Sequence, residues 1–383
     1  MEFELSEEHE LMRETAQNFA RDRIAPLVAE DEAAHRFRPE LVREMGELGF
    51  FGAIIDEAYG GSNAGYLASA LMTMEVAQVS ASWGLPFNMQ TMGPGLTIQR
   101  WGTEEQKQRY IPKLVTGETL GCFAMTEPGT GSDVASMKTE ATHTKDGWVL
   151  NGQKTWISQA VEADVGLVFA YTDRAKKQRG ITCFIVDLKD TEGISTAPIK
   201  DKFGLYCAPT GEIFFQDALI PDGSVLGEVD QGFKVCMAML DGTRLSCASR
   251  AVGVGKACLA EAARYAKERT QFGQPISSFQ MVQSDLVEMH VEHEAARLLV
   301  LRAAATRDAG NLRNTVEVST AKYFAAEAAV HAANTAMKVF GSYGFSTEYP
   351  AARLLRDSKS FQIVEGTSNI QKMIIARQVL DEY

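Results

Sequence analysis

Residues 361–371 read FQIVEGTSNIQ, and the KMIIARQVLDEY that follows has the spacing of a helix. A short apolar run, FQIV, leads to a single carboxylate, Glu365, and then to a Gly-Thr-Ser-Asn turn in which Thr367 or Ser368 can cap the helix. A carboxylate between a buried segment and a helix can serve as a base, but glutamate before a helix is more often a solvated charge. These residues alone leave both interpretations open.

The composition of the chain excludes several classes of protein. With 383 residues, 45% of them hydrophobic, the chain is long enough for two or three globular domains. A formal net charge of -12 argues against nucleic acid or an anionic membrane as a partner. The six cysteines are scattered without a CxxC pair, which is typical of buried thiols in a reducing compartment. The N-terminal sequence MEFELSEEHELM is unlike a signal or transit peptide, and no apolar run approaches the ~20 residues that span a bilayer, so we expect a cytoplasmic location.

The pattern of the chain changes twice along its length. Helical spacing with Gly-rich connections predicts an all-α domain over residues 1–117. Short β-branched and aromatic runs bounded by Gly, Asp, Lys and Pro predict an antiparallel sheet or barrel over residues 118–229. Helical spacing then returns, and four long amphipathic helices with short connections predict an antiparallel bundle over residues 230–383. We therefore expect an α+β protein of three domains.

Local signals refine this expectation at two places. The dipeptides Asp146-Gly147 and Asn151-Gly152 each predict a β-hairpin turn. In the last domain the spacing predicts one helix over Phe233–Leu240 and another over Leu245–Arg269, with Asp241 as a helix cap between them.

Two further motifs can carry chemistry. The stretch CFAMTEPGTGSDVASM, residues 122–137, places hydroxyls and unhindered backbone N–H groups after a strand, so it can line the edge of a cofactor or form a plain hairpin. In KTWIS, Trp156 lies on a predicted strand, where tryptophan is most often a core residue. The dispersed histidines form no metal-binding pattern, and no nucleophile elbow, phosphate loop or dinucleotide fingerprint occurs.

The strings IVEGTSNIQ and TEPGTGSDVASM closely resemble motifs of the acyl-CoA dehydrogenases, and the α–β–α order resembles their fold over nearly the whole chain. The resemblance implies an N-terminal all-α domain, a middle antiparallel β-barrel domain and a C-terminal four-helix bundle. It also implies that FAD is the cofactor and that Glu365 abstracts the α-proton of an acyl-CoA thioester.

The resemblance implies a set of cofactor contacts. Thr126 would bond the polar edge of the flavin, Trp156 would lie against its ring, and Ser158 would lie near N5. Arg269, Phe272 and Gln280 would reach the FAD of a neighbouring subunit, which makes a homotetramer the expected assembly. The full set is Phe123, Met125, Thr126, Gly131, Ser132, Trp156, Ser158, Arg269, Phe272, Gln280, Lys338, Val339, Gly341, Ser342, Thr367 and Asn369.

Two positions of the FAD diphosphate loop depart from the family pattern, because Lys338 replaces a frequent Gln and Ser342 a frequent Gly.

Substrate contacts and electron transfer are inferred in the same way. Asp241 and Arg244 in LDGTRLSCA would face the CoA arm, and the other substrate contacts would be Thr91, Ser132 and Gly366. Some branched-chain members of the family carry their catalytic glutamate at the position of Thr243, so in this chain the base is expected at Glu365 instead. An electron-transferring flavoprotein is the expected electron acceptor, and an O₂-using flavin oxidase of the same fold is the alternative.

The acyl group is inferred from one loop. The stretch ASWGLPFNMQTMGPG resembles the glutaryl-CoA and cyclohexanoyl-type dehydrogenases, and glutaryl enzymes carry an arginine at the position of Gly84 to pair the distal carboxylate of the substrate. A buried, unpaired carboxylate costs several kcal/mol, so an uncharged, compact acyl group is expected. Diene-forming relatives use an Asp at the position of Thr91, which cannot act as a base. Cyclohexane-1-carboxyl-CoA is the best candidate, with short straight- or branched-chain acyl-CoA as the alternative.

Overall fold

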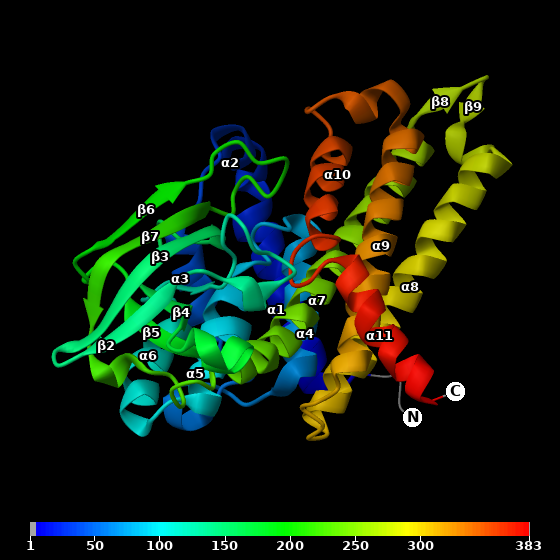
Figure 1. The fold of residues 1–383 in the computed structure, drawn as a ribbon. Helices are drawn as coiled ribbons and strands as arrows, with labels where there is room; N and C mark the ends of the chain where they lie inside the picture. Colours follow the sequence, from blue (N-terminus) through cyan, green and yellow to red (C-terminus); the bar gives the residue numbers. More distant parts are fainter. Residues whose placement is uncertain (1–4, 383) are drawn as a thin grey trace.

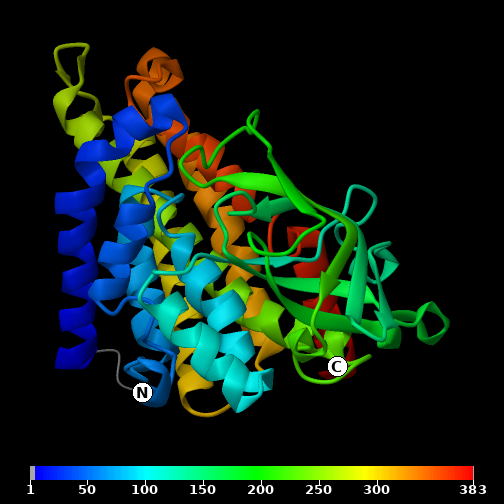
Figure 2. The ribbon, with the colours of Figure 1, turned by 90° about the vertical axis from the view of Figure 1, so that its left-hand side faces the viewer.

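A twisted β-sheet stands beside a bundle of long helices in the computed structural model, which describes residues 5–382 (Figure 1). The expected domain limits at residues 1 and 383, and part of the N-terminal stretch judged above, lie outside the described residues. A second group of helices, from the first third of the chain, fills the space behind the sheet and against the bundle (Figure 2). The order along the chain is helices, then strands, then helices, as expected.

The first third of the chain is helical because its apolar residues recur at helical spacing and its helices are capped. The hydroxyl of Ser6 accepts a hydrogen bond from the backbone N–H of His9, and Thr103 forms a capping box with Gln106. A π-helical segment, Phe87–Gly95, leads directly into the fifth helix, and all nine of its residues are buried. The α-helices are α1 (Glu7–Phe19), α2 (Val28–Ala34), α3 (Pro39–Glu47), α4 (Gly65–Val79), α5 (Leu96–Trp101) and α6 (Glu104–Val115).

Seven strands form one sheet in the order β1-β4-β2-β3-β7-β6, with β5 also paired to β4. The expected antiparallel pairing holds for most neighbours, but β1 pairs β4 in parallel along four residues, and β2 meets β4 in parallel at one position. Parallel pairing is possible because a long connection, not a tight turn, separates β1 from β4. The strands are β1 (Gly121–Ala124), β2 (Glu140–Thr144), β3 (Gly147–Ser158), β4 (Val165–Tyr171), β5 (Ile181–Asp187), β6 (Ile194–Pro198) and β7 (Thr210–Ile220).

Only one of the two hairpin signals marks a turn. The prediction at Asp146-Gly147 is confirmed, because β2 and β3 pair up to Thr144 and Gly147. The prediction at Asn151-Gly152 is wrong, since β3 continues to Ser158 and the register against β7 shifts beside Gly152. Gly152 has a φ of +144°, so here the glycine permits a bulge.

The last third of the chain forms the helical bundle. The expected break at Asp241 is wrong, because one helix runs through it: the carboxylate binds Arg244 and Thr315 and caps no helix. A small β8–β9 hairpin projects from the far end of the bundle (Figure 1). The elements are α7 (Gly232–Glu268), β8 (Thr270–Gln271), β9 (Gln274–Pro275), α8 (Gln280–Asp308), α9 (Thr315–Phe340), α10 (Pro350–Phe361) and α11 (Ser368–Glu382).

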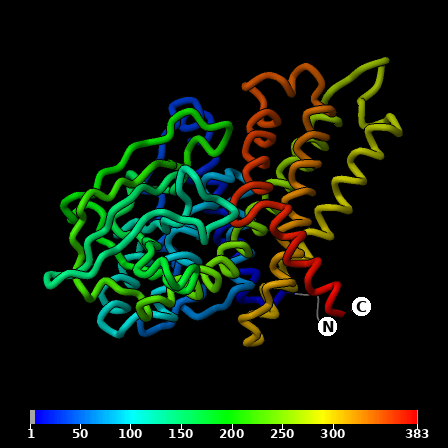
Figure 3. Tube along the Cα trace, viewed as in Figure 1, coloured from blue at the N-terminus to red at the C-terminus, as the bar shows by residue number. Residues whose placement is uncertain are grey.

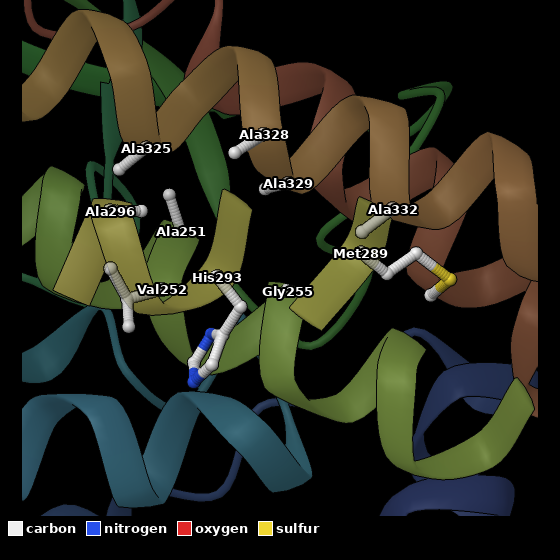
Figure 4. Close-up of a pocket in the computed structure, with 10 residues that line it drawn as sticks. All are labelled: Ala251, Val252, Gly255, Met289, His293, Ala296, Ala325, Ala328, Ala329 and Ala332. Atoms are coloured by element: carbon white, nitrogen blue, oxygen red, sulfur yellow. The ribbon is translucent and has the colours of Figure 1, made fainter. Parts of the chain in front are cut away.

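Small side chains let the bundle helices approach closely. Ala325, Ala328, Ala329 and Ala332 of α9 face α7 and α8 across a gap of about 10 Å³, roughly the least that one water needs (Figure 4). This gap is a packing defect in the largest hydrophobic core of the molecule.

We predict that Gly152→Ala destabilises the protein. A Cβ at this position would lie 2.6 Å from Thr139 Oγ1 and 2.7 Å from Thr139 Cα, and the backbone conformation also disfavours a side chain. The free energy of unfolding should fall by about 1–3 kcal/mol. Urea unfolding measures this change, with Gly223→Ala as the control, because a Cβ at Gly223 meets no atom within 4 Å. Equal stability of the two variants would contradict the steric argument.

Candidate active site

Glu365 belongs to the loop between α10 and α11. This loop extends from the bundle towards the strands (Figure 3). Glu365 has a φ of +57° and the next residue, Gly366, a φ of +84°. A left-handed conformation is uncommon for a residue other than glycine and costs on the order of 1 kcal/mol or more. Neighbouring groups must therefore hold this turn in place.

Three buried side chains from three helices hold the turn through its carbonyl oxygens. Arg244 Nε of α7 donates to the Glu365 carbonyl at 3.3 Å, and Lys322 Nζ of α9 donates to the Gly366 carbonyl at 2.7 Å. Gln371 Nε2 of α11 donates to both carbonyls, at 3.2 and 2.9 Å. Burial lowers the pKa of Lys322, although the nearby Cys247 and Glu365 oppose this shift. The backbone of the loop is thus fixed by groups that no solvent competes for.

The carboxylate of Glu365 is held by two further hydrogen bonds. Asn88 Nδ2 donates to one carboxylate oxygen at 2.8 Å, and Thr243 Oγ1 of α7 donates to the other at 2.5 Å. In the sequence, position 243 is notable only as the alternative position for the base. Because Thr243 contacts the Glu365 carboxylate, a carboxylate at position 243 would lie close to where the Glu365 carboxylate lies. Asn88 was missed, because nothing in the local pattern of a buried π-helical segment shows which side chain faces another domain.

The residues around Glu365 differ in part from expectation. The four residues before it do not form one buried segment: Phe361 ends α10 and is fully buried, but Ile363 is 59% and Val364 37% exposed. The reason is that α10 buries one face only, and the chain leaves the helix directly after Phe361. Thr367 caps α11 by accepting from the backbone N–H of Ile370 at 3.3 Å, one of the two caps predicted.

The loop after β1 lies beside the end of β3. The backbone N–H of Thr155 donates to the Thr126 carbonyl at 2.9 Å, so Thr126 and Trp156 belong to adjacent chain segments. The sulfur of Met125 contacts the Cys236 thiol of α7 at 2.8 Å, while Phe123 packs against the π-helical segment at Gly93. The loop expected to contact flavin is thus joined to the helix that carries Thr243.

A buried ion pair fixes this loop from behind. Lys154 Nζ donates to Glu127 Oε1 at 2.8 Å and to the Met125 carbonyl at 3.1 Å, and both side chains are buried. Glu127 also accepts from the backbone N–H groups of Lys138 and Thr139. Burial alone would raise the pKa of Glu127, but the Lys154 charge and these hydrogen bonds lower it, so the carboxylate is ionised at neutral pH.

The outer surface of this region fits a flat aromatic group with a polar edge. Trp156 is 58% exposed with a φ of +58°, contrary to the core position usual for a strand tryptophan, and Ser158 two residues later is half-buried. Gly131 and Ser132 are exposed, and a Cβ at Gly131 would meet no atom within 4 Å. An exposed indole can stack on a flat aromatic ring, and exposed hydroxyls and backbone N–H groups can donate to its polar edge or to phosphates.

The remaining expected cofactor residues form a second group at the end of the bundle. Phe272 at the tip of the β8–β9 hairpin is 94% exposed, and Arg269 lies over the Tyr343 ring at 5.5 Å. Val339 is buried at the end of α9, whereas Gln280, Gly341 and Ser342 are exposed. Lys338 forms an ion pair with Asp285 at 2.8 Å. The 12-residue helix α10, about 18 Å long, separates this group from Glu365, so one chain does not gather both groups at one compact site.

The expected substrate residues also fall into separate places. Arg244 is at the Glu365 loop and pairs with Asp241 at 3.1 Å, and Gly366 follows Glu365 directly. The Thr91 hydroxyl, however, donates to the Phe51 carbonyl inside the N-terminal core. Asn369, one of the expected cofactor residues, is exposed in the first turn of α11.

Metal ligands, membrane-spanning helices and other cavities also bear on function. Among residues 5–382 no group of three or more His, Cys, Asp and Glu side chains could hold a metal ion, and no helix is long and apolar enough to cross a membrane. A cavity of about 740 Å³ lies between α2, Tyr206 and the start of α10, away from Glu365.

Models of all three acyl-CoA dehydrogenase domains match the chain: the N-terminal domain at residues 6–118, the middle domain at 122–218 and the C-terminal domain at 230–380. The chain belongs to the acyl-CoA dehydrogenase family, whose members are enzymes that use FAD. The expected fold is confirmed, with the middle sheet as a half-barrel.

Individual relatives are similar over their whole length. A glutaryl-CoA dehydrogenase of Desulfococcus multivorans is 44% identical over 98% of this chain and 97% of its own. A short-chain specific mitochondrial acyl-CoA dehydrogenase of Mus musculus is 38% identical over 99% and 92%. The structure of a glutaryl-coenzyme A dehydrogenase in complex with glutaryl-CoA superposes with a TM-score of 0.98 at 44% identity, covering 100% of this chain and 97% of the other.

We predict that Lys154→Met strongly destabilises the protein, because it leaves the Glu127 carboxylate buried without its cation. The free energy of unfolding should fall by about 3–5 kcal/mol. Urea unfolding followed by fluorescence measures the loss.

The double variant Lys154→Met/Glu127→Gln removes the buried charge as well and should recover a large part of the loss. The exposed pair Lys189–Asp164 gives the control: Lys189→Met should change stability by less than about 1 kcal/mol. A double variant no more stable than Lys154→Met would argue against the ion pair as the source of the effect.

Proposed function

We propose that this enzyme removes hydrogen from the α and β carbons of a compact acyl-CoA thioester, with Glu365 as the base that takes the α-proton. The observation that supports this most is the placement of the Glu365 carboxylate. A strained turn, three side chains that donate to its carbonyls and two that donate to its carboxylate oxygens orient Glu365 between the N-terminal helical domain and the bundle.

The chain's own groups account for the proton transfer. The hydrogen bonds from Asn88 and Thr243 keep the carboxylate in one orientation, so that it meets a substrate α-carbon without a search through rotamers. The Glu365 backbone N–H donates to no acceptor among residues 5–382 and is free to polarise a thioester carbonyl, which makes the α-proton more acidic. Both groups of one residue would then act on adjacent substrate atoms.

The residues that would hold the flavin lie on the loop after β1 and at the end of β3, and Met125 of that loop contacts Cys236 of α7, the helix that also carries Thr243. Thr126, Trp156 and Ser158 would hold the ring system, and Gly131 and Ser132 the adjacent phosphate or thioester arm. When bound, FAD supplies the acceptor for the hydride that leaves the β-carbon. The group around Arg269 and Phe272 would serve the FAD of a second copy in a homotetramer. Electron-transferring flavoprotein as acceptor and a cytoplasmic location are part of the same proposal.

Buried apolar residues beside Asn88 support a compact acyl group. Leu85 and Met89, on the segment that also carries Asn88, form a small buried cluster with Ala208. Cyclohexane-1-carboxyl-CoA is the candidate that the sequence favours, with short straight- and branched-chain acyl-CoA as the alternative. Faster bleaching of the flavin band by butyryl-CoA than by the cyclic thioester would exclude the cyclic candidate. Glycine at position 84 does not establish the charge of the acyl group, because a charged side chain can also come from another segment.

An O₂-using oxidase of the same fold is distinguished by its product. Hydrogen peroxide formed in air at the rate of substrate turnover would favour an oxidase, and peroxide far below that rate favours a dehydrogenase.

We predict that Glu365→Gln retains yellow FAD and binds acyl-CoA but loses flavin reduction. An amide keeps the shape of the side chain and cannot take a proton, and a general base contributes about 10²–10⁴-fold to a rate. Stopped-flow absorbance of the flavin under anaerobic conditions measures the step. Reduction at more than a tenth of the wild-type rate would remove Glu365 from the role of base.

We predict a smaller effect for Thr243→Val, which removes one hydrogen bond to the carboxylate while keeping the size of the side chain. Reduction should slow on the order of 10-fold, in line with the loss of one hydrogen bond to a charged group. Thr97→Val serves as the control, because the Thr97 hydroxyl donates to a helix carbonyl away from Glu365. Equal rates for both variants would show that Thr243 does not orient the base.

A further inference from the structure

Arg250 of α7 is a buried arginine whose charge has no carboxylate partner among residues 5–382. Its side chain is 1% exposed, its Nε has no hydrogen-bond partner, and its one charge contact among the described residues is with the face of the Phe361 ring. Leaving a guanidinium buried and unpaired costs several kcal/mol. Such a group calls for a partner that the chain itself does not supply.

Arg250 lies on the same face of α7 as the residue that binds the Glu365 carboxylate. Thr243, Cys247 and Arg250 are spaced i, i+4 and i+7, which places them in one row along a helix. Seven residues rise about 10 Å along the axis. Cys247 lies between them: burial raises the pKa of its thiol, the charges of Lys322 and Arg250 lower it, and the Glu365 charge raises it.

Two other segments also contact Arg250 at one position and reach Glu365 four residues later. On the segment before α5, Asn88 binds the Glu365 carboxylate, and Gly84, four residues earlier, lies against Arg250. On α10, Phe361 is four residues before Glu365, and the Arg250 guanidinium lies 5.7 Å from the centre of its ring. Three segments therefore each connect Glu365 with Arg250, and an acyl chain that extended along them from the reacting carbons would reach the guanidinium.

We propose that Arg250 binds a negatively charged group at the far end of the acyl chain, so that the preferred substrate is a short acyl-CoA with a second carboxylate. This inference rests on the proposed function, since it takes Glu365 as the site of proton removal. A planar guanidinium matches a carboxylate through two parallel hydrogen bonds, and in a buried site this pairing strongly favours the charged substrate over a neutral one.

Arg250 changes the expected acyl group from uncharged to charged. Position 84 carries no arginine, but Arg250 would supply a guanidinium from α7. A Cβ at Gly84 would lie 2.9 Å from Arg250 Cγ, so the stem of Arg250 fills the space that a side chain at position 84 would enter. The Arg250 side chain of α7 can occupy this space because position 84 is glycine.

The test compares substrates of matched length on the purified holoenzyme. We expect flavin reduction by glutaryl-CoA to exceed that by pentanoyl-CoA and by cyclohexane-1-carboxyl-CoA in kcat/KM. In Arg250→Gln, the ratio of kcat/KM for glutaryl-CoA to that for pentanoyl-CoA should fall on the order of 100-fold. Arg250→Lys keeps the charge but loses the planar fork, so its ratio should lie between those of the wild type and Arg250→Gln.

The control is Arg307→Gln, at a second buried arginine that lies over the Tyr66 ring and binds Asn314. It should leave the substrate ratio unchanged, and thermal unfolding of each variant separates loss of folding from loss of selectivity. A wild-type preference for the neutral thioesters, or an unchanged ratio in Arg250→Gln, would overturn the role of Arg250 and leave the proposed function standing. Failure of every acyl-CoA to reduce the flavin would instead overturn the proposed function.

Discussion

The structure around the candidate site depends on two carbonyl groups, those of Glu365 and Gly366. Both residues are in left-handed conformations, and the chain passes through them between two helices. Such a turn is stable only where contacts with its surroundings offset the cost of its backbone conformation. Hydrogen bonds supply these contacts, from Arg244 of α7, Lys322 of α9 and Gln371 of α11. The bundle therefore does more than fill a core, because three of its helices each provide one donor to the same turn.

The sheet domain uses the same device on the opposite side. The Lys154–Glu127 pair is buried, and each partner also binds backbone groups: the ammonium binds the Met125 carbonyl, and the carboxylate binds two N–H groups. A buried pair adds little net stability over an apolar pair, but it admits few alternative arrangements. In both domains, buried charged groups fix a loop that would otherwise have many conformations.

The sequence predicts the order of helices and strands well, since periodicity and capping are local, and Thr367 caps α11 as expected. It fails where a residue's partner is distant. Asp241 was expected to cap a helix, but in the fold its carboxylate binds Thr315. Asn151-Gly152 was expected to form a turn, but pairing with β7 continues past it with a register shift. The Glu365 motif is recognisable in the sequence, but Asn88, 277 residues away, is not. Contacts of this separation depend on how the domains pack, which no local pattern encodes.

Gly84 and Arg250 show most clearly why a site cannot be read position by position. A pocket is a volume, and a charge can enter that volume from any segment of its wall. Where a loop carries a large side chain, the facing helix must carry a small one, and the reverse holds when the loop carries glycine, because close-packed interiors have no room for both. The substitution of a residue in one wall therefore gains its meaning only from the residue that faces it. The absence of a charged residue from the loop is, in this fold, the condition that allows Arg250 to be accommodated.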